Sequence, residues 1–207
     1  PCGAPDICMA LGNSLKIGLI STVLATILGT LIAFALGRYK FAGRSTTNLL
    51  IFLPMATPEI VLGASLLSLF LVFEINPGFW PTVIAHVMFC ISFVVVTVKA
   101  RIASLDPRLE QAAMDLYANE FQTFRRVTLP LVAPGIAGAA LLAFSLSFDD
   151  FIITNFNSGT VITFPKFVYT AAARGIPAQA NVIGSGMFFL ALAIVIAGQF
   201  VNRRKAR

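Results

Sequence analysis

The chain consists of long apolar runs separated by short polar segments. Five runs, at residues 11–37, 49–73, 80–98, 131–156 and 180–201, each reach the ~20 residues that cross a bilayer as an α-helix. Apolar and polar residues do not alternate within them, as they would in the strands of a membrane barrel. Because backbone groups in lipid must be bonded within their own segment, the pattern predicts an all-α, polytopic transmembrane bundle of about five spans.

Composition excludes a water-soluble globular protein. Hydrophobic residues make up 57% of the chain and charged residues 12%, and the mean hydropathy is +0.87. A soluble globular domain carries about 25% charged residues. The apolar runs are therefore expected to lie in lipid.

The basic residues predict the orientation in the membrane. Of the 15 Lys and Arg residues, all but Lys16, Lys166 and Arg174 fall in connections around residues 38–44 and 99–126 or near the C-terminus. Lys and Arg accumulate in cytoplasmic loops, so segment 99–130 and the C-terminus are predicted to be cytoplasmic and the N-terminus of the chain outside. The net charge of +6 then reflects topology, and its spread over three loops argues against nucleic-acid binding.

The polar segment 106–130 contains a predicted amphipathic helix. Asp106-Pro107 supplies a helix start. Three- and four-residue spacing forms one apolar face from Leu109, Ala112, Ala113 and Leu116. The other side, formed by Glu110, Gln111 and Asp115, could meet basic residues of a partner or face water. Amphipathicity alone fits a docking helix and a solvated connector equally well.

The same segment resembles the EAA loop of ABC-transporter permease subunits. That loop reads Glu-Ala-Ala, three residues, Gly, nine residues, Ile, any residue, Leu-Pro. The equivalent positions here hold Gln111-Ala112-Ala113, Tyr117, Val127 and Leu129-Pro130. Gln111 replaces the acid although Glu110 lies beside it, and Tyr117 replaces the glycine.

The resemblance implies that segment 99–130 couples the membrane helices to an ATPase. The coupling residues would be Glu110, Gln111, Ala112, Ala113, Asp115, Leu116, Tyr117, Leu129 and Pro130. In the family, the glycine ends the helix in a left-handed conformation, which costs a non-glycine residue about 1–2 kcal/mol. We expect either strain at Tyr117 or a turn shifted to Asn119, which tolerates that conformation better.

Glu59 is an acid within an apolar run. Thr57-Pro58 before it is interpreted as the N-cap and first residue of a helix that restarts there. The carboxylate would then complement a helix N-terminus or line a pathway. It lies about 15 Å deep if the span begins at Leu49, and at the cytoplasmic surface if the span begins at Thr57. Segment 53–63 resembles the corresponding helix of polyamine permeases.

Asp149 and Asp150 are adjacent acids near the outer end of a predicted span. Neighbours on a helix point about 100° apart, so at most one is expected to face a pathway. The other would cap a helix, pair with Lys166 or Arg174, or reach water. An outer-surface pair that serves solubility is the alternative reading.

Segments 147–154, 163–166 and 174–177 resemble the spermidine/putrescine permease subgroup. Polyamines are flexible polycations, and carboxylates beside aromatic rings bind ammonium groups through charge and cation–π contacts. The predicted pathway residues are Glu59, Asp149, Asp150, Phe148 and Trp80.

Other residue types point to structural roles. His86, the sole histidine, is expected to be packed and hydrogen-bonded within a span. The three cysteines lack the paired spacing of a zinc site, and two of them, Cys2 and Cys8, are interpreted as loosely placed thiols. Close helix packing is expected at glycines, including Gly135-x-x-Gly138 and Gly184-x-Gly186.

The resemblance covers residues 11–207, which are expected to form one permease domain of the type I ABC importer kind. Residues 1–10 form an atypical extracytoplasmic N-terminus, and a further span is expected upstream of residue 11. The chain has no G-x-x-x-x-G-K-[ST] phosphate loop. Mg-ATP is therefore expected to be used by partner subunits, with no cofactor or metal on this chain, which is not itself an enzyme.

The implied function is that of a polyamine permease subunit in the bacterial plasma membrane. Its expected partners are a second permease subunit, two copies of an ATPase and an extracytoplasmic substrate-binding protein. A permease for another solute, such as ferric ion, a sulfonate or a sugar, would keep the loop without needing the two aspartates. A truncated, non-functional remnant is a further alternative. An intramembrane enzyme would need catalytic groups at one depth, and no such set can be assembled.

Overall fold

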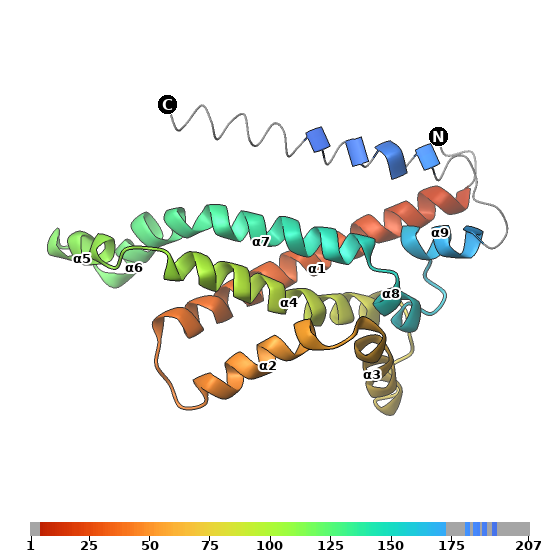
Figure 1. Cartoon of the computed structure of the whole chain (residues 1–207), viewed down its shortest axis with the longest axis horizontal. Helices are drawn as coiled ribbons and strands as arrows, with labels where there is room; N and C mark the ends of the chain where they lie inside the picture. Colours follow the sequence, from red (N-terminus) through yellow and green to blue (C-terminus); the bar gives the residue numbers. More distant parts are fainter. Residues whose placement is uncertain (1–4, 173–180, 183, 187, 190–191, 194–207) are drawn as a thin grey trace. The chain divides into compact units, whose positions relative to one another are not determined.

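The computed structural model describes residues 5–172, 181–182, 184–186, 188–189 and 192–193, and every regular element among them is helical (Figure 1). The elements are α1 (Pro5–Arg38), α2 (Arg44–Ala56), α3 (Glu59–Val72), α4 (Phe79–Ala103), α5 (Arg108–Asp115), α6 (Glu120–Thr123), the π-helical turn η1 (Phe124–Thr128), α7 (Leu129–Asp149), α8 (Ile152–Asn157) and α9 (Phe164–Ala172). The predicted all-α fold is confirmed.

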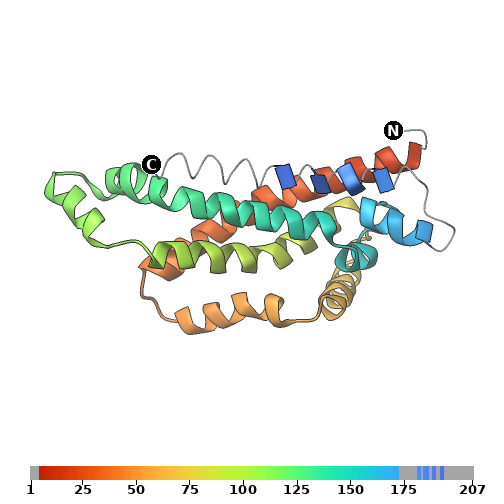
Figure 2. The same ribbon diagram turned by 45° about the horizontal axis from the view of Figure 1, so that its top comes forward.

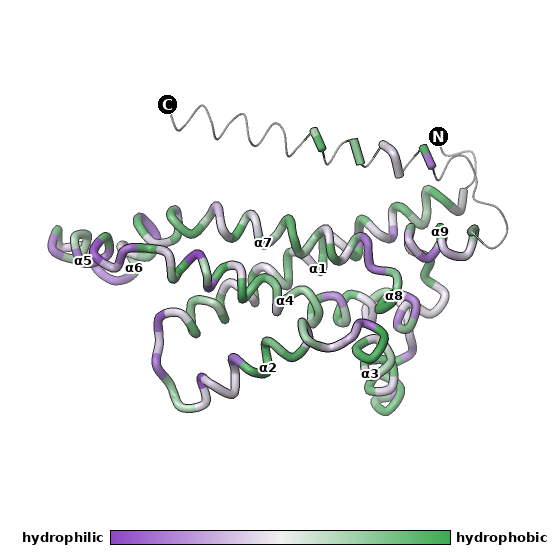
Figure 3. The backbone as a smooth tube through the Cα atoms, in the orientation of Figure 1, coloured by the Kyte–Doolittle hydropathy of each residue, from purple (hydrophilic) through white to green (hydrophobic). Residues whose placement is uncertain are grey.

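Within the described residues, three helices are long and apolar enough to cross a membrane: Ile7–Arg38, Phe79–Ala103 and Glu120–Asp149, the last formed by α6, η1 and α7 together. Helices α2 and α3 make a fourth span if they are counted as one. Hydrophobic residues predominate along these helices, whereas hydrophilic residues gather in α5, in α6 and in the α1–α2 connection (Figure 3). The predicted run 180–201 lies largely outside the described residues.

The predicted span 49–73 is not a straight helix. Its two halves, α2 and α3, are bent by 110° at Thr57-Pro58. Thr57 has extended backbone angles, as the residue before a proline prefers, and its hydroxyl donates to the Leu53 carbonyl at 2.7 Å. Thr57 therefore closes α2, and its predicted role as N-cap of the next helix is wrong. The bend also removes the basis for placing Glu59 by counting helical rise from Leu49.

Residues 14–161 form one compact unit, in which α4 packs between α1 and α7. The approach to α1 is close, because a Cβ on Gly29 would lie 2.7 Å from the Val94 Cγ1 atom. On the other side, a Cβ on Gly135 of α7 would lie 2.6 Å from the Arg101 Cγ atom. Gly138 has no atom within 4 Å of such a Cβ. The predicted close packing thus holds at Gly135 and not at Gly138.

Residues 1–13 and 162–207 form the second compact unit. In it, the Asn13 amide donates to the Ile162 carbonyl at 3.0 Å. Cys8 is disulfide-bonded, so its interpretation as a loosely placed thiol is wrong. At Gly184 and Gly186 an added Cβ would have no atom within 4 Å.

Candidate functional site

Helix α5 presents most of its predicted apolar face to the outside. Pro107 occupies its N-cap position, and the Asp106 carboxylate accepts the Arg108 N–H at 2.9 Å. Leu109, Ala112 and Leu116 are exposed, and Ala113 is half-buried. Because Leu116 is 81% exposed, the described part of the chain leaves this side chain almost uncovered.

Tyr117 ends α5 in a left-handed conformation, with φ +62°. The Tyr117 N–H donates to the Met114 carbonyl at 2.9 Å, and the Ala118 N–H donates to the Ala113 carbonyl at 3.2 Å. This pair of bonds is the Schellman motif, which favours glycine at the left-handed position. The turn therefore lies where the family pattern has its glycine, and a tyrosine occupies it.

Asn119 does not take over that turn. Its φ is −75°, and it begins α6 as N-cap. The Asn119 side-chain oxygen accepts the Gln122 N–H at 2.8 Å, while the Gln122 side chain accepts the Asn119 N–H at 3.1 Å. This reciprocal capping box fixes the start of α6 directly after the left-handed residue.

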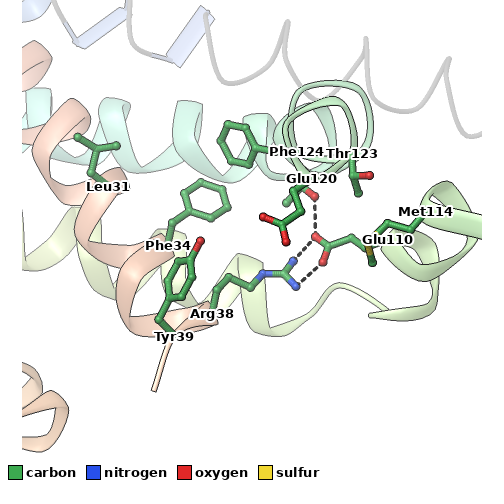
Figure 4. A pocket seen from close by; sticks show the side chains of 10 residues that line it. Leu31, Phe34, Arg38, Tyr39, Glu110, Met114, Glu120, Thr123 and Phe124 are labelled. Atoms are coloured by element: carbon green, nitrogen blue, oxygen red, sulfur yellow. Dashed lines mark hydrogen bonds and ion pairs between the residues drawn. The ribbon is translucent and has the colours of Figure 1, made fainter. Parts of the chain in front are cut away.

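The Glu110 carboxylate is bound within the chain. Arg38 Nη1 donates to Oε2 at 2.6 Å, and Arg38 Nη2 donates to Oε1 at 2.5 Å (Figure 4). The Thr128 hydroxyl donates to Oε1 at 2.5 Å. Glu110 was predicted to meet a partner's basic residues or water, and the structure gives it Arg38 instead. Gln111 and Asp115 are exposed.

A cavity of about 360 Å³ opens beside this cluster (Figure 4). Its apolar lining includes Phe34 and Phe124, whose rings meet edge to face with centroids 5.3 Å apart. Arg38, Glu110 and Glu120 supply charged groups to the same lining.

Leu129-Pro130 begins α7 directly after the π-helical turn. A proline inside a helix lacks an N–H and crowds the carbonyl four residues earlier, which here belongs to Arg126 in η1. The wider π turn relieves that crowding. The Arg101 guanidinium of α4 donates to the Leu131 carbonyl at 2.9 and 3.1 Å and ties the start of α7 to α4.

At the other end of α7, Asp149 is exposed and Asp150 is buried. The Asp150 carboxylate accepts the Ile153 N–H at 3.2 Å and the Thr154 N–H at 2.8 Å, and so caps α8. Of the roles weighed for the two aspartates, the structure gives Asp150 the capping one.

The imidazole ring of His86 contacts Asp150, with the Nε2 atom 3.3 Å from the carboxylate. His86 Nδ1 lies 2.6 Å from the Ser147 hydroxyl, and Nε2 lies 2.9 Å from the Thr154 hydroxyl. The expected packed, hydrogen-bonded role of His86 is confirmed. Pairing with Lys166 or Arg174, another role weighed for the two aspartates, stays a prediction; Arg174 lies outside the described residues.

Glu59 lies exposed in the first turn of α3, within electrostatic range of both Asp149 and Asp150. Helix α3 packs on α8, whose first N–H groups the Asp150 carboxylate accepts. A Cβ on Gly63 would lie 3.0 Å from the Phe156 ring, and the Asn157 amide donates to the Gly63 carbonyl at 3.3 Å.

The two aromatic candidates pack on neighbouring rings. Phe148 stacks on Phe144 with centroids 5.8 Å apart. Trp80, in the first turn of α4, is 63% exposed and meets Phe79 edge to face at 5.4 Å. In the described residues, no group of three or more His, Cys, Asp or Glu side chains is placed to hold a metal ion.

Sequence reasoning missed two participants in the cluster around Glu110. Arg38 was counted only as a topology signal, and Thr128 lay inside the loop pattern without a role. Their contacts with Glu110 span 72 and 18 residues. No periodicity within a single helix could indicate them.

Comparison with known proteins finds one family and two named relatives that match most of this chain. Residues 22–203 match the family described as "Binding-protein-dependent transport system inner membrane component". The spermidine/putrescine transport system permease protein PotC of Escherichia coli (strain K12) is 37% identical over 203 residues, which cover 98% of this chain and 77% of that protein. The putrescine transport system permease protein PotI of the same organism is 37% identical over 185 residues, covering 85% and 66%.

Two solved structures share the fold. The inward-facing MetNI methionine ABC transporter superposes with a TM-score of 0.75 at 15% identity, covering 95% of this chain and 94% of that chain. A bacterial ABC transporter that imports the acidic polysaccharide alginate gives a TM-score of 0.69 at 18% identity, covering 95% and 79%.

Proposed function

This chain belongs to the family of binding-protein-dependent transport system inner membrane components, and we propose that it is the permease subunit of an ATP-driven polyamine importer. It is a membrane transport component. ATP is hydrolysed by two copies of a separate ATPase subunit, while a second permease subunit completes the pathway. An extracytoplasmic binding protein delivers the substrate.

Helix α5 is the observation that carries this proposal. It stands between two helices of membrane-spanning length and ends in a defined turn, with Leu109, Ala112 and Leu116 exposed. Exposed apolar side chains on a short helix favour insertion into a groove on another protein. Gln111 and Asp115 flank this face and supply polar contacts at its rim.

The same contacts support an orientation in a bacterial plasma membrane. The Arg38–Glu110 pair brings the α1–α2 connection and segment 99–130 to one end of the 14–161 unit. Both carry the basic residues typical of cytoplasmic loops. This end faces the cytoplasm together with the C-terminus, and the N-terminus of the chain lies outside.

Three acids in the membrane domain, Glu59, Asp149 and Asp150, support a polycationic substrate. Glu59 and Asp149 are exposed, whereas the Asp150 carboxylate is occupied by the N–H groups of α8 and by His86. Acids within a membrane domain mark substrate or ion pathways. Glu59 and Asp149 therefore attract the ammonium groups, and Asp150 holds α8 in place beside them.

Uptake of radiolabelled putrescine by the complete transporter in proteoliposomes tests this assignment. Glu59→Gln and Asp149→Asn should each lower uptake about tenfold, corresponding to about 1.4 kcal/mol, while the ATPase subunits stay bound. Glu74→Gln, a change at an exposed acid beyond the end of α3, is the matched control and should leave uptake intact. Full putrescine uptake by both variants would show that Glu59 and Asp149 do not line the pathway, whereas a wild-type transporter that binds its ATPase and takes up no putrescine would favour a permease for another solute. A wild-type chain that binds no ATPase would favour a non-functional remnant.

A further inference from the structure

We infer that Glu110 is a positioning residue that joins α5 to α1 through Arg38 and to the start of α7 through Thr128, so that displacement of α5 moves both membrane helices together. The inference rests on the proposed function, because α5 must receive the motion from an ATPase. In this role Glu110 transmits motion between helices of this chain and does not contact a partner protein.

The three residues come from three different segments. Glu110 lies in the first turn of α5, Arg38 is the last residue of α1, and Thr128 is the last residue of η1, directly before α7. One carboxylate therefore links the cytoplasmic ends of two membrane-length helices to the short helix between them (Figure 4). We call this set of contacts the Glu110 brace.

Both oxygens of the Glu110 carboxylate are engaged. Oε2 accepts one guanidinium nitrogen of Arg38, while Oε1 accepts the other nitrogen and the Thr128 hydroxyl. The paired Arg–carboxylate geometry adds directional specificity to the attraction of the charges. A carboxylate that already accepts three hydrogen bonds can accept few more from a partner protein. The polar contacts with a partner are therefore made by the exposed neighbours Gln111 and Asp115.

Local electrostatics favour the same arrangement. The positive end of a helix dipole lies at its N-terminus, where α5 places Glu110, and the negative end lies at the C-terminus, where α1 places Arg38. The Arg38 and Glu110 side chains are 28% and 23% exposed. Water therefore screens the pair less than it screens a fully exposed one.

Part of the space between α5 and α1 is open. The cavity of about 360 Å³ opens between Phe34 of α1, Met114 of α5 and Phe124 of η1. Across this space the Arg38–Glu110 contact provides a direct link between the two helices. Its loss should let α5 move without α1.

The brace makes a prediction that docking alone does not. If Glu110 transmits motion, Glu110→Gln leaves the ATPase bound and active but separates ATP hydrolysis from transport. If Glu110 were a docking residue, the same variant would lose ATPase and transport in proportion. The ratio of putrescine transported to ATP hydrolysed distinguishes the two roles.

The experiment uses the complete transporter in proteoliposomes with putrescine as substrate. Glu110→Gln and Arg38→Gln should each retain the co-purified ATPase and at least half of the hydrolysis rate, and should lower the transport-to-hydrolysis ratio at least fivefold. The double variant should be no worse than either single one, because the pair acts as a unit. The charge exchange Arg38→Glu with Glu110→Arg should recover part of the ratio. Glu120→Gln, which lines the same cavity, is the matched control and should leave the ratio intact.

An unchanged ratio in both single variants overturns the brace, as does a loss of bound ATPase that matches the loss of transport. Additive effects in the double variant would also contradict it. These results leave the proposed function intact, because the wild-type complex assembles and transports in each case. Failure of the wild-type chain to bind ATPase or to transport putrescine overturns the proposed function and the brace together.

Discussion

Two acids stand near the two ends of α7, and each contacts an Arg or His side chain and a threonine. Before the helix, Glu110 is bound by Arg38 and Thr128; after it, Asp150 is bound by His86 and by the backbone of α8. They differ in burial. The side chains of the first pair are 28% and 23% exposed, and those of the second are 2% and 3% exposed.

This difference in burial determines how much each set of contacts contributes to the free energy of unfolding. Removing a partner from a buried, hydrogen-bonded polar group costs about 1–3 kcal/mol, and more for a carboxylate, because the group left behind is unsatisfied. A pair that water reaches contributes about 0–1 kcal/mol. The contacts at the Asp150 end of α7 therefore contribute more to stability than the contacts at the Glu110 end.

The largest predicted effect is at the buried cluster. Asp150→Asn should lower the free energy of unfolding by about 3 kcal/mol, since it removes the charge that His86 and two N–H groups of α8 contact. Asp149→Asn, at the exposed neighbour, should change it by less than about 0.5 kcal/mol. Chemical unfolding of the purified protein in detergent measures both. Equal stability of the two variants would contradict the distinction between the buried Asp150 and the exposed Asp149.

Between the two clusters, packing is tight on one side of α4. Gly29→Ala should lower the free energy of unfolding by about 1–3 kcal/mol, because the new methyl group would meet Val94, whose branched side chain has little freedom to move. Gly138→Ala, in open space on α7, should instead raise it by about 0.5–1 kcal/mol through helix propensity. The same unfolding measurement compares them, and a loss of stability in both variants would contradict the packing described.

Tyr117→Gly should stabilise the turn after α5 by about 1 kcal/mol, because glycine adopts the left-handed conformation without the steric cost. Coupled ATP hydrolysis by the reconstituted transporter should rise as the turn becomes more regular. Tyr117→Ala removes the ring but keeps the strained backbone, and should not reproduce the gain. Unchanged stability and hydrolysis in Tyr117→Gly would show that the left-handed residue bears no strain.

The smallest predicted effect is at the half-buried Arg38–Glu110 pair. Glu110→Gln should lower the free energy of unfolding by less than about 1 kcal/mol, and this difference should shrink between low salt and about 1 M salt because exposed charges are screened. The effect of Asp150→Asn should be nearly independent of salt. Unfolding at two ionic strengths measures both effects. A loss of several kcal/mol in Glu110→Gln would show that the contacts at the two ends of α7 contribute similarly to stability.

The sequence predicted the features that repeat along one helix or lie at fixed spacing. Hydropathy gave the membrane helices, and the loop pattern placed the left-handed residue at Tyr117, where the structure has it. A hydropathy profile does not report the direction of a helix axis, so it could not show that the run 49–73 bends by 110° at Thr57-Pro58.

The clusters at the two ends of α7 could not be read from spacing. Arg38 and Glu110 are 72 residues apart, and His86 contacts a hydroxyl 68 residues away. Such contacts depend on which faces of α1, α4 and α7 meet. The alternatives for Asp149 and Asp150 were separated only when the start of α8 showed which carboxylate caps it.

Docking of α5 on an ATPase is the central claim, and site-specific crosslinking in native membranes tests it most directly. Ala112→Cys places a reactive group on the exposed face of α5, and Asn155→Cys places one on α8, next to the opposite end of α7. If α5 docks on the ATPase, Ala112→Cys should give a crosslinked product with the ATPase subunit and Asn155→Cys should give none. No product from Ala112→Cys, or equal products from both positions, would contradict it.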